Sequence, residues 1–322
     1  MVNTLKNRIL EGDLIDREDA LNLIDAPLEE LCDAADEIRK KMAGSSFDIC
    51  TIVNGKCGKC SEDCKYCAQS AHYITALEES YPLLDTDTLV KDAKSKAKRG
   101  VLRYSVVTSG KRLSSAEVDS LCESIRKIKE EADIKVCVSL GLLGKEDFVK
   151  LHEAGADRVH CNLETSERYF PEVCTTHTYA EKIETLLAAK EAGMSICSGG
   201  IMGLGETFED RIDMILTARS LGVKSVPMNF LNPIEGTPYE NNTPLTRDEA
   251  RRCIAIARFI IPDGSIRLAG GRGMLGDKGK SCFKSGSNAA ISGDMLTTAG
   301  ISIETDLKLI SELGFESKLC ND

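Results

Sequence analysis

The feature that most constrains the fold of this chain is an alternation between short β-branched runs and longer amphipathic segments, repeated along most of its length. The short runs have the length and composition of buried strands, and the segments between them carry apolar residues at helical spacing. Strands are predicted at residues 47–53, 103–108, 135–140, 158–163, 195–201, 225–230, 265–269 and 288–292, and helices at 87–98, 115–132, 145–154, 179–192, 208–221 and 247–260. This alternation predicts an α/β fold of the TIM type, a parallel (β/α)8 barrel.

The segments outside the repeat predict helical extensions at both ends of the barrel. Residues 1–46 carry one or two amphipathic helices, and residues 299–322 form a helical tail. No low-complexity linker divides the chain, so residues 47–298 are assigned to one barrel domain. An open doubly wound sheet is the competing architecture, because the glycines of 271–276 match a dinucleotide-binding fingerprint, but no helical pattern begins directly behind them.

Charge and composition argue against nucleic acid and membrane partners. The chain carries 41 lysines and arginines against 51 aspartates and glutamates, a net charge of −10 with histidine neutral, and no basic block stands out. No span approaches the ~18 continuous apolar residues of a membrane helix, and no apolar signal segment precedes the first strand, so we expect a cytoplasmic protein. There, the 14 cysteines are expected as reduced thiols and metal ligands rather than disulfides.

Three cysteines lie close together on the loop after the first predicted strand. Cys60, Cys64 and Cys67 form a Cys-x3-Cys-x2-Cys motif. Three thiolates this close can bind three corners of a cubane 4Fe-4S cluster and leave the fourth iron open to a small molecule. A structural zinc site is the alternative, but such a site usually needs four closed ligands and a second pair of cysteines with similar spacing, which the sequence lacks.

Further cysteines fall on the predicted strands, where barrel enzymes place working residues at the carboxyl ends. Cys137, Cys161 and Cys197 lie on the third, fourth and fifth strands. A single buried cysteine more often fills space as a small apolar side chain. Because the three agree in strand position, they are also compatible with a second metal centre.

From about residue 45 to about residue 300 the chain resembles the biotin synthase family of radical S-adenosylmethionine enzymes. The resemblance is carried by several segments, residues 58–70, 162–166, 197–207, 228–229 with 236–238, and 267–272. It implies sulfur insertion into dethiobiotin to form biotin, with a 4Fe-4S cluster, S-adenosylmethionine and an auxiliary 2Fe-2S cluster as the sulfur donor. It also implies a homodimer, iron-sulfur assembly machinery, and an electron donor such as flavodoxin or ferredoxin.

In that family three cysteines and an arginine hold the auxiliary cluster, and the resemblance assigns three of these positions to Cys137, Cys197 and Arg267. The fourth position is Ser105, which lies in Arg103-Tyr-Ser where the family has a cysteine. Serine is a poor replacement, because iron-sulfide clusters prefer soft thiolates to a hard alkoxide.

A rebuilt auxiliary centre is our hypothesis for this departure. Cys57, at the end of the first strand, and Cys161, where the family usually has histidine, are proposed to join the other ligands in a larger or differently bridged centre. Strand alternation argues partly against Cys161, since it and Asn162 should point to opposite faces unless a bulge intervenes. Each thiol has a plainer alternative role as a buried or loop cysteine.

The resemblance also implies a set of residues that bind the nucleotide. Tyr66 would pack on the adenine, and Glu164 would lie near the ribose hydroxyls, where the family has aspartate. Lys182 stands where an arginine would grip the methionine carboxylate, although a solvated helix lysine is an alternative.

The strand-five segment and two amides complete the implied site. Gly199, Gly200 and Ile201 would let backbone approach the cofactor closely, or the glycines would only relieve crowding in the barrel. Asn162 and Asn229 would read the ureido ring of dethiobiotin, because an amide offers both a donor and an acceptor.

Two other functions stay open at this point. A related radical enzyme could act on a small metabolite without donating sulfur, which the change at Ser105 favours. A non-catalytic metal-binding protein is the other, and it would leave the set Asn162, Glu164 and Asn229 unexplained.

Overall fold

A closed parallel barrel forms the centre of the computed structural model, which describes residues 1–77 and 79–320. Neighbouring strands pair in the order β1-β2-β3-β4-β5-β7-β8-β9, and β9 pairs with β1 to close the ring. The strands are β1 Ser46–Lys56, β2 Arg103–Thr108, β3 Lys135–Ser139, β4 Arg158–His160, β5 Ser195–Cys197, β6 Gly200–Met202, β7 Ser225–Phe230, β8 Ser265–Leu268 and β9 Ala289–Ile291. The predicted (β/α)8 barrel is confirmed, and closure excludes the open doubly wound sheet.

The fifth predicted strand is divided into β5 and β6, which together fill one position of the barrel. Both pair with β7, β5 through Cys197 and β6 through residues 200–202. At the break the side chain of Asn162 accepts a hydrogen bond from the backbone N–H of Gly199 at 3.1 Å. A side-chain amide therefore replaces one rung of the strand ladder, which is why a single predicted strand appears as two.

Helices cover the outside of the barrel, and most of them begin at a residue that caps the helix. The helices between strands are α4 Thr86–Lys98, α5 Ser115–Glu131, α6 Lys145–Glu153, α7 Phe170–Val173, α8 Tyr179–Glu191, α9 Phe208–Ser220, α10 Arg247–Ile260, the 3-10 turn η1 Arg272–Leu275 and α11 Lys280–Phe283. Ser114, Thr178, Thr207 and Thr246 each form a capping box with a carboxylate three residues on. These caps fix where the loops at the carboxyl ends of the strands must end.

The N-terminal segment folds into three helices, one more than the one or two predicted. They are α1 Val2–Leu10, α2 Arg17–Asn22 and α3 Leu28–Met42. A capping box at Asp16 starts the short α2, and Pro27 precedes α3, so local turn chemistry divides the segment. Helix α3 packs on α10, where Arg251 of α10 contacts Glu29 through two hydrogen bonds of 2.8 and 2.7 Å.

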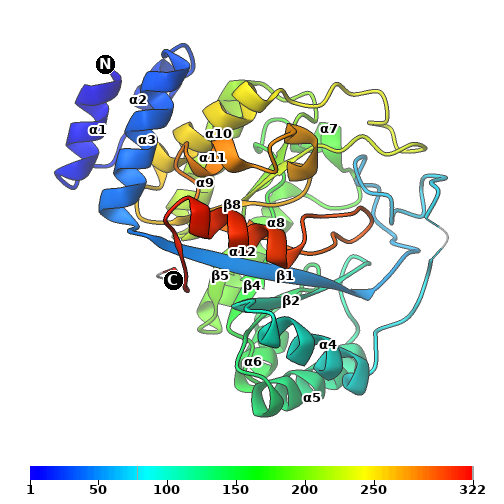
Figure 1. Cartoon of the computed structure of the whole chain (residues 1–322). Helices are drawn as coiled ribbons and strands as arrows, with labels where there is room; N and C mark the ends of the chain where they lie inside the picture. Colours follow the sequence, from blue (N-terminus) through cyan, green and yellow to red (C-terminus); the bar gives the residue numbers. More distant parts are fainter. Residues whose placement is uncertain (78, 321–322) are drawn as a thin grey trace.

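The C-terminal tail contains helix α12 Ile303–Glu312 and also a short strand, β10 Glu316–Ser317, which the sequence did not predict. Strand β10 pairs with the start of β1 at Ser46 and Phe47. Figure 1 shows α1 and β10 on the side where β1 begins, whereas β1 points toward the side that carries residues 57–77 and 79–85. The division into residues 1–46, 47–298 and 299–322 stays a prediction. Among the described residues, none of the helices has the length and apolarity needed to span a membrane.

Candidate active site

One cavity of 410 Å³ extends from the interior of the barrel to the loops that follow the strands. Half of the cysteines in the chain line it, namely Cys50, Cys60, Cys64, Cys67, Cys137, Cys161 and Cys197. Most of the strand residues in its wall are two positions apart, with Cys50 and Ile52 on β1, Arg103, Ser105 and Val107 on β2, Cys137 and Ser139 on β3, Arg158 and His160 on β4, and Pro227 and Asn229 on β7. Thr108 and Phe230 join them at the ends of β2 and β7. The wall therefore consists of the inner face of the barrel, as expected for the active site of this fold.

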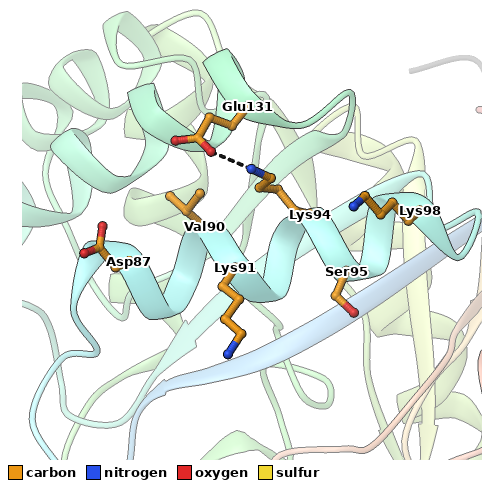
Figure 2. A pocket seen from close by; sticks show the side chains of 7 residues that line it. All are labelled: Asp87, Val90, Lys91, Lys94, Ser95, Lys98 and Glu131. Carbon is orange, nitrogen blue, oxygen red and sulfur yellow. Dashed lines mark hydrogen bonds and ion pairs between the residues drawn. The ribbon is translucent and has the colours of Figure 1, made fainter.

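A second hollow, of 490 Å³, lies on the surface along α4 (Figure 2). It is lined by lysines of α4 together with Asp87, Val90, Ser95 and Glu131, and Lys94 makes a 2.7 Å ion pair with Glu131. None of these lining residues is a cysteine or histidine. We assign the active site to the cavity inside the barrel, because the sulfur and buried polar groups converge there.

The rim site comprises Cys60, Cys64 and Cys67, which the structure brings into the same cavity at the end of β1. All three are partly exposed, and the Cys67 N–H donates to the carbonyl of Cys64 at 3.0 Å, so the loop turns tightly between them. The backbone N–H of Gly110 lies 3.2 Å from the Cys60 sulfur and can stabilise a thiolate there. Their role as cluster ligands stays a prediction, but their placement suits three corners of one cluster.

Two acidic residues of the loop attach the rim site to the turn before α8. Asp63 accepts hydrogen bonds from the backbone N–H groups of Thr175 at 2.8 Å and Thr176 at 3.1 Å. Burial works against ionisation of Asp63, but hydrogen bonds from the Thr175 hydroxyl and from these two N–H groups hold its pKa below the usual range. Glu62 lies 2.7 Å from Nδ1 of His177. This attachment leaves no signal in the sequence, because its partners are more than a hundred residues apart.

Cys174, which the sequence analysis treated as an ordinary residue, lies directly behind Cys64. Its sulfur is 3.7 Å from the Cys64 sulfur and 3.3 Å from Nδ1 of His177. The hydrogen bond from Cys64 and another from His177 lower the pKa of Cys174 to about 4, although burial opposes this. Within the described residues, the ligand atoms of Cys64, Cys174 and His177 lie within 4.8 Å of one another. Cys174 itself is outside the cavity wall, so it supports Cys64 from the protein side.

A short chain of hydrogen bonds joins the three residues expected near the nucleotide and substrate. The Tyr66 hydroxyl donates to one carboxylate oxygen of Glu164 at 2.9 Å, and the Asn162 amide lies 3.3 Å from the other. Burial, followed by the charge of Glu164, raises the pKa of Tyr66. Glu164 also has a left-handed backbone, with φ of 70°, in the loop that follows β4. All three residues line the cavity.

The two amides expected to read the substrate are held by backbone groups of the strand ends. Asn162 accepts from Gly199, as above, and Asn229 donates to the carbonyl of Gly200 at 3.1 Å while accepting from the N–H of Gly270 at 2.9 Å. These contacts fix the orientation of each amide. Each amide still has hydrogen-bonding capacity for a ligand in the cavity, because it offers two donors and two acceptor sites.

The two glycines of strand five meet protein backbone rather than the cavity. A Cβ atom on Gly199 would lie 2.0 Å from the carbonyl oxygen of Pro227, and one on Gly200 would lie 2.2 Å from that of Glu164. Neither glycine lines the cavity, whereas Ile201 does. The alternative given from the sequence, relief of crowding between strands, therefore describes their surroundings better than close approach to a cofactor.

Lys182 is buried, so its interpretation as a solvated helix lysine is wrong. It is 8% exposed, lines the cavity, and places its ammonium 5.9 Å from the centre of the Phe170 ring. Burial alone would lower the pKa of Lys182, but the charges of Cys161 and Glu164 outweigh it and raise the value. A buried cation at this height of the barrel is suited to an anionic ligand group.

The interior site comprises Cys50, Cys137, Cys197 and Arg267, all buried and all in the cavity wall. Arg267 of β8 donates through Nη1 to the carbonyls of Asp48 at 2.9 Å and Ala290 at 3.1 Å. These bonds leave the guanidinium fixed between β1 and β9. Its Nη2 makes no hydrogen bond to any residue that the structure describes, and it lies 3.3 Å from a carboxylate oxygen of Asp48.

Asp48 connects two strands of the interior through a buried ion network. Its carboxylate accepts from Nε of Arg103 at 2.7 Å and faces Arg267, and its side chain is fully buried. Desolvation would raise the pKa of Asp48, but Arg267 and Arg103 lower it below the ordinary value.

His160 of β4 acts on the interior site through Cys197. Burial disfavours ionisation of Cys197, but a hydrogen bond from His160 and the nearby charges of Arg158 and Arg267 lower the pKa of this thiol to about 6. The sequence analysis singled out neither His160 nor Asp48 nor Cys50. Spacing of two along the predicted strands was the available signal, since Asp48, Cys50 and Ile52 are alternate residues of β1 and therefore share a face.

The two cysteines proposed for a rebuilt centre lie in different places. Cys57 is outside the cavity wall, where its thiol lies 3.5 Å from the carbonyl of Glu79. The structure therefore does not bring Cys57 to the interior site. Cys161 does line the cavity together with Asn162, and it belongs to the apolar core. Burial raises the pKa of its thiol, and the nearby charges that act on it are those of Lys182 and Glu164.

Family comparisons divide the chain into two matched parts. The Radical SAM superfamily matches residues 56–218, and the Biotin and Thiamin Synthesis associated domain matches residues 227–316. A relative in Corynebacterium diphtheriae named Biotin synthase 2 is 55% identical, with 98% of this chain and 95% of the relative covered. The Biotin synthase of Brachyspira hyodysenteriae is also 55% identical, over 100% of this chain and 96% of the relative.

Solved structures of other proteins share the fold. The crystal structure of methylornithine synthase superposes with a TM-score of 0.81 at 18% identity and covers 98% of this chain and 97% of that one. A maturase of the FeFe-hydrogenase superposes with a TM-score of 0.82 at 16% identity, over 99% of this chain and 76% of that one. At such low identity these two likenesses concern the fold alone.

Proposed function

This chain belongs to the biotin synthase family of radical S-adenosylmethionine enzymes, and we propose that the cavity inside its barrel carries out sulfur insertion into dethiobiotin to form biotin. The observation that carries the proposal is the presence of two separate groups of cysteines in one continuous wall, one at the rim and one in the interior. A saturated carbon cannot be deprotonated by an ordinary side chain, so the chemistry requires cofactors that protein groups position.

The residues of the rim site fit a 4Fe-4S cluster with one open corner. Cys60, Cys64 and Cys67 would hold it, because three soft thiolates converge on the cavity and a backbone N–H already points at one of them. When bound, the two clusters of this family supply the electron that cleaves S-adenosylmethionine and the sulfur that enters the product.

The residues of the interior site fit an auxiliary iron-sulfur cluster. A buried guanidinium nitrogen of Arg267 has no hydrogen bond among the described residues, and buried thiols line the cavity beside it. Such a nitrogen is costly to bury unless a further acceptor is present. Anionic sulfur of a cluster would satisfy it.

The remaining cavity residues bind and orient the organic ligands in this proposal. Tyr66 and Glu164, already hydrogen-bonded to one another, present a ring and a carboxylate to the nucleoside, and Lys182 offers its buried charge to the methionine carboxylate. The fixed amides of Asn162 and Asn229 donate to and accept from the ureido ring. Burial of the interior strands keeps water away from reactive intermediates.

Several partners follow from the same proposal. The reducing electron comes from a small redox protein, for which we propose a flavodoxin or a ferredoxin, and iron-sulfur assembly machinery loads the two sites. All 14 cysteines of the chain are unpaired, which suits the reducing cytoplasm. We also propose a homodimer, which light scattering of the purified protein tests directly.

Anaerobic turnover tests the function. The reconstituted, reduced protein should convert dethiobiotin and S-adenosylmethionine to biotin and 5′-deoxyadenosine, each measured by mass spectrometry. Formation of 5′-deoxyadenosine without biotin would favour the related radical enzyme that donates no sulfur. Failure to form either product, with the iron sites loaded, would reject the radical mechanism.

A further inference from the structure

Cys50 of β1 lies in the interior site in a way that the sequence pattern did not reveal. It is 7% exposed and lines the same cavity as Cys137, Cys197 and Arg267. In the strand register Cys50 stands opposite Arg103 of β2 on one side and Ile291 of β9 on the other. Because β1, β8 and β9 are neighbours in the ring, its position is on the Arg267 side of the cavity.

The groups that act on the Cys50 thiol are the other members of the interior site. Burial has the largest influence on its pKa and raises it, and the charges that follow are those of Arg267, Cys137, Asp48 and Cys197. Of these groups, Arg267, Cys137 and Cys197 line the same cavity as Cys50. Among the described residues, the Cys50 thiol has one hydrogen bond, a 3.4 Å contact to the carbonyl of Thr51.

Packing separates these cysteines from those that merely fill space. The buried cysteines Cys122, Cys253 and Cys282 are members of the main apolar core, as expected for small hydrophobic side chains. Cys50, Cys137 and Cys197 are just as buried but belong to neither apolar cluster among the residues that the structure describes. They line the active-site cavity instead, together with Arg267, where they can contact a bound group.

Two other side chains compete for the same role and are less suited to it. Ser105 lines the cavity opposite Cys137 on β3, but its hydroxyl is a hard ligand that iron-sulfur clusters disfavour. Cys161 belongs to the apolar core and is influenced by Lys182 and Glu164 rather than by Arg267.

We infer that Cys50 is a thiolate ligand of the auxiliary cluster, so that Cys50, Cys137 and Cys197 together with Arg267 hold it and Ser105 does not. This inference rests on the proposed function, which supplies the auxiliary cluster. The thiol of Cys50 loses its proton when it binds iron, and Arg267 beside it offsets the negative charge that results.

Variants that exchange cysteine and serine between positions 50 and 105 test the inference. The variants are Cys50→Ser, the double variant Cys50→Ser with Ser105→Cys, and the matched control Cys122→Ser, a buried cysteine of α5 in the apolar core. Each full-length protein is reconstituted anaerobically, and its iron and acid-labile sulfide are determined chemically. Mössbauer spectra then assign the iron to the two clusters. The response of the rim cluster to S-adenosylmethionine is followed by electron paramagnetic resonance.

In Cys50→Ser we expect specific loss of the auxiliary iron and sulfide. The rim cluster should keep its iron, about four atoms per chain, and its response to S-adenosylmethionine. The control should keep both clusters, and the double variant should regain auxiliary iron, because Ser105 lies on the same wall. Full auxiliary counts in Cys50→Ser, equal losses in Cys122→Ser, or a double variant that stays depleted would overturn the inference. Wild-type protein with both clusters that forms no biotin would instead count against the proposed function alone.

Discussion

The rim site and the interior site present cysteines in opposite ways. At the rim, Cys60, Cys64 and Cys67 lie within eight consecutive positions of one loop, are partly exposed, and depend on a separate turn at residues 174–177 for their support. In the interior, the cysteines come from three different strands and are fully buried. The rim site therefore suits a cluster with one open corner that must admit a ligand. The interior site suits a cluster that protein groups hold on all sides.

The contacts that hold the two sites in place also differ. The rim loop is attached by hydrogen bonds between side chains and backbone, such as Asp63 to Thr175, which can break and reform without disturbing the barrel. The interior is attached by the strand register and by the buried contacts of Asp48 with Arg103 and Arg267. Mutations at the rim should therefore affect ligand binding first, and mutations in the interior should affect stability as well as cluster content.

The largest expected effect is a loss of activity that leaves the iron of the interior site in place. Cys64→Ala removes one rim ligand, and 5′-deoxyadenosine and biotin formation should fall on the order of a thousandfold or more, because the cofactor supplies the difficult step. Iron of the interior site should remain, as measured by iron and sulfide content.

Cys174→Ser is the matched control for that variant, because Cys174 lies 3.7 Å from Cys64 but outside the cavity wall. It should keep the rim iron and most of the activity. Rim iron that survives in Cys64→Ala, or that disappears in Cys174→Ser, would show that the ligand set at the rim is different.

The second prediction concerns the ion network that supports the interior. Asp48→Asn leaves Arg103 and Arg267 facing a neutral amide, and removal of one partner from a buried charged network costs about 3–5 kcal/mol in the free energy of unfolding. Denaturant unfolding of the full chain measures it. The exposed pair of Lys224 and Asp263 provides the control, since Asp263→Asn should cost less than about 1 kcal/mol. Equal costs would mean that the network does not support the barrel.

The same variant has a pH dependence with a defined sign. The pKa of Asp48 is lowered in the folded protein, so its contribution to stability is present above the unfolded value of about 3.9 and is lost as the pH falls through the folded value. The stability difference between wild type and Asp48→Asn should therefore be constant near neutral pH and narrow below about pH 4. A difference that widens on acidification would contradict the depressed pKa.

The ligand residues of the rim site could be predicted from the sequence more fully than those of the interior site, and the reason is physical. The rim motif is local, so Cys60, Cys64 and Cys67 could be recognised from spacing alone, and the strand and helix periods gave the barrel itself. The interior depends on which residues of different strands stand at the same height, and that register is set by long-range pairing, such as Cys50 with Ile291. Cys57 and Cys50 are both near the start of the barrel in sequence, yet only Cys50 faces the cavity.

A third prediction sharpens the role of the rim as the ligand-binding side. Tyr66→Phe removes the hydroxyl that donates to Glu164 at 2.9 Å, and loss of one such bond should weaken S-adenosylmethionine binding about 2- to 10-fold. Cluster content should not change. Tyr169→Phe is the matched control, because its hydroxyl bonds to the carbonyl of Leu204 and it does not line the cavity. Equal weakening in both variants would mean that the effect is not specific to the nucleotide.

The smallest expected effects come from the two cysteines first suggested as extra ligands. Cys57→Ala should leave both iron counts unchanged and alter the free energy of unfolding by no more than about 1 kcal/mol, since its thiol lies outside the cavity wall and contacts the loop carbonyl of Glu79. Cys161→Ala should also keep the auxiliary iron, because Cys161 belongs to the apolar core, unlike Cys50, Cys137 and Cys197. Its effect should appear instead as weaker S-adenosylmethionine binding, through the altered packing beside Lys182. Auxiliary iron lost from either variant would mean that the interior site extends toward the rim, and the separation of the two regions would no longer hold.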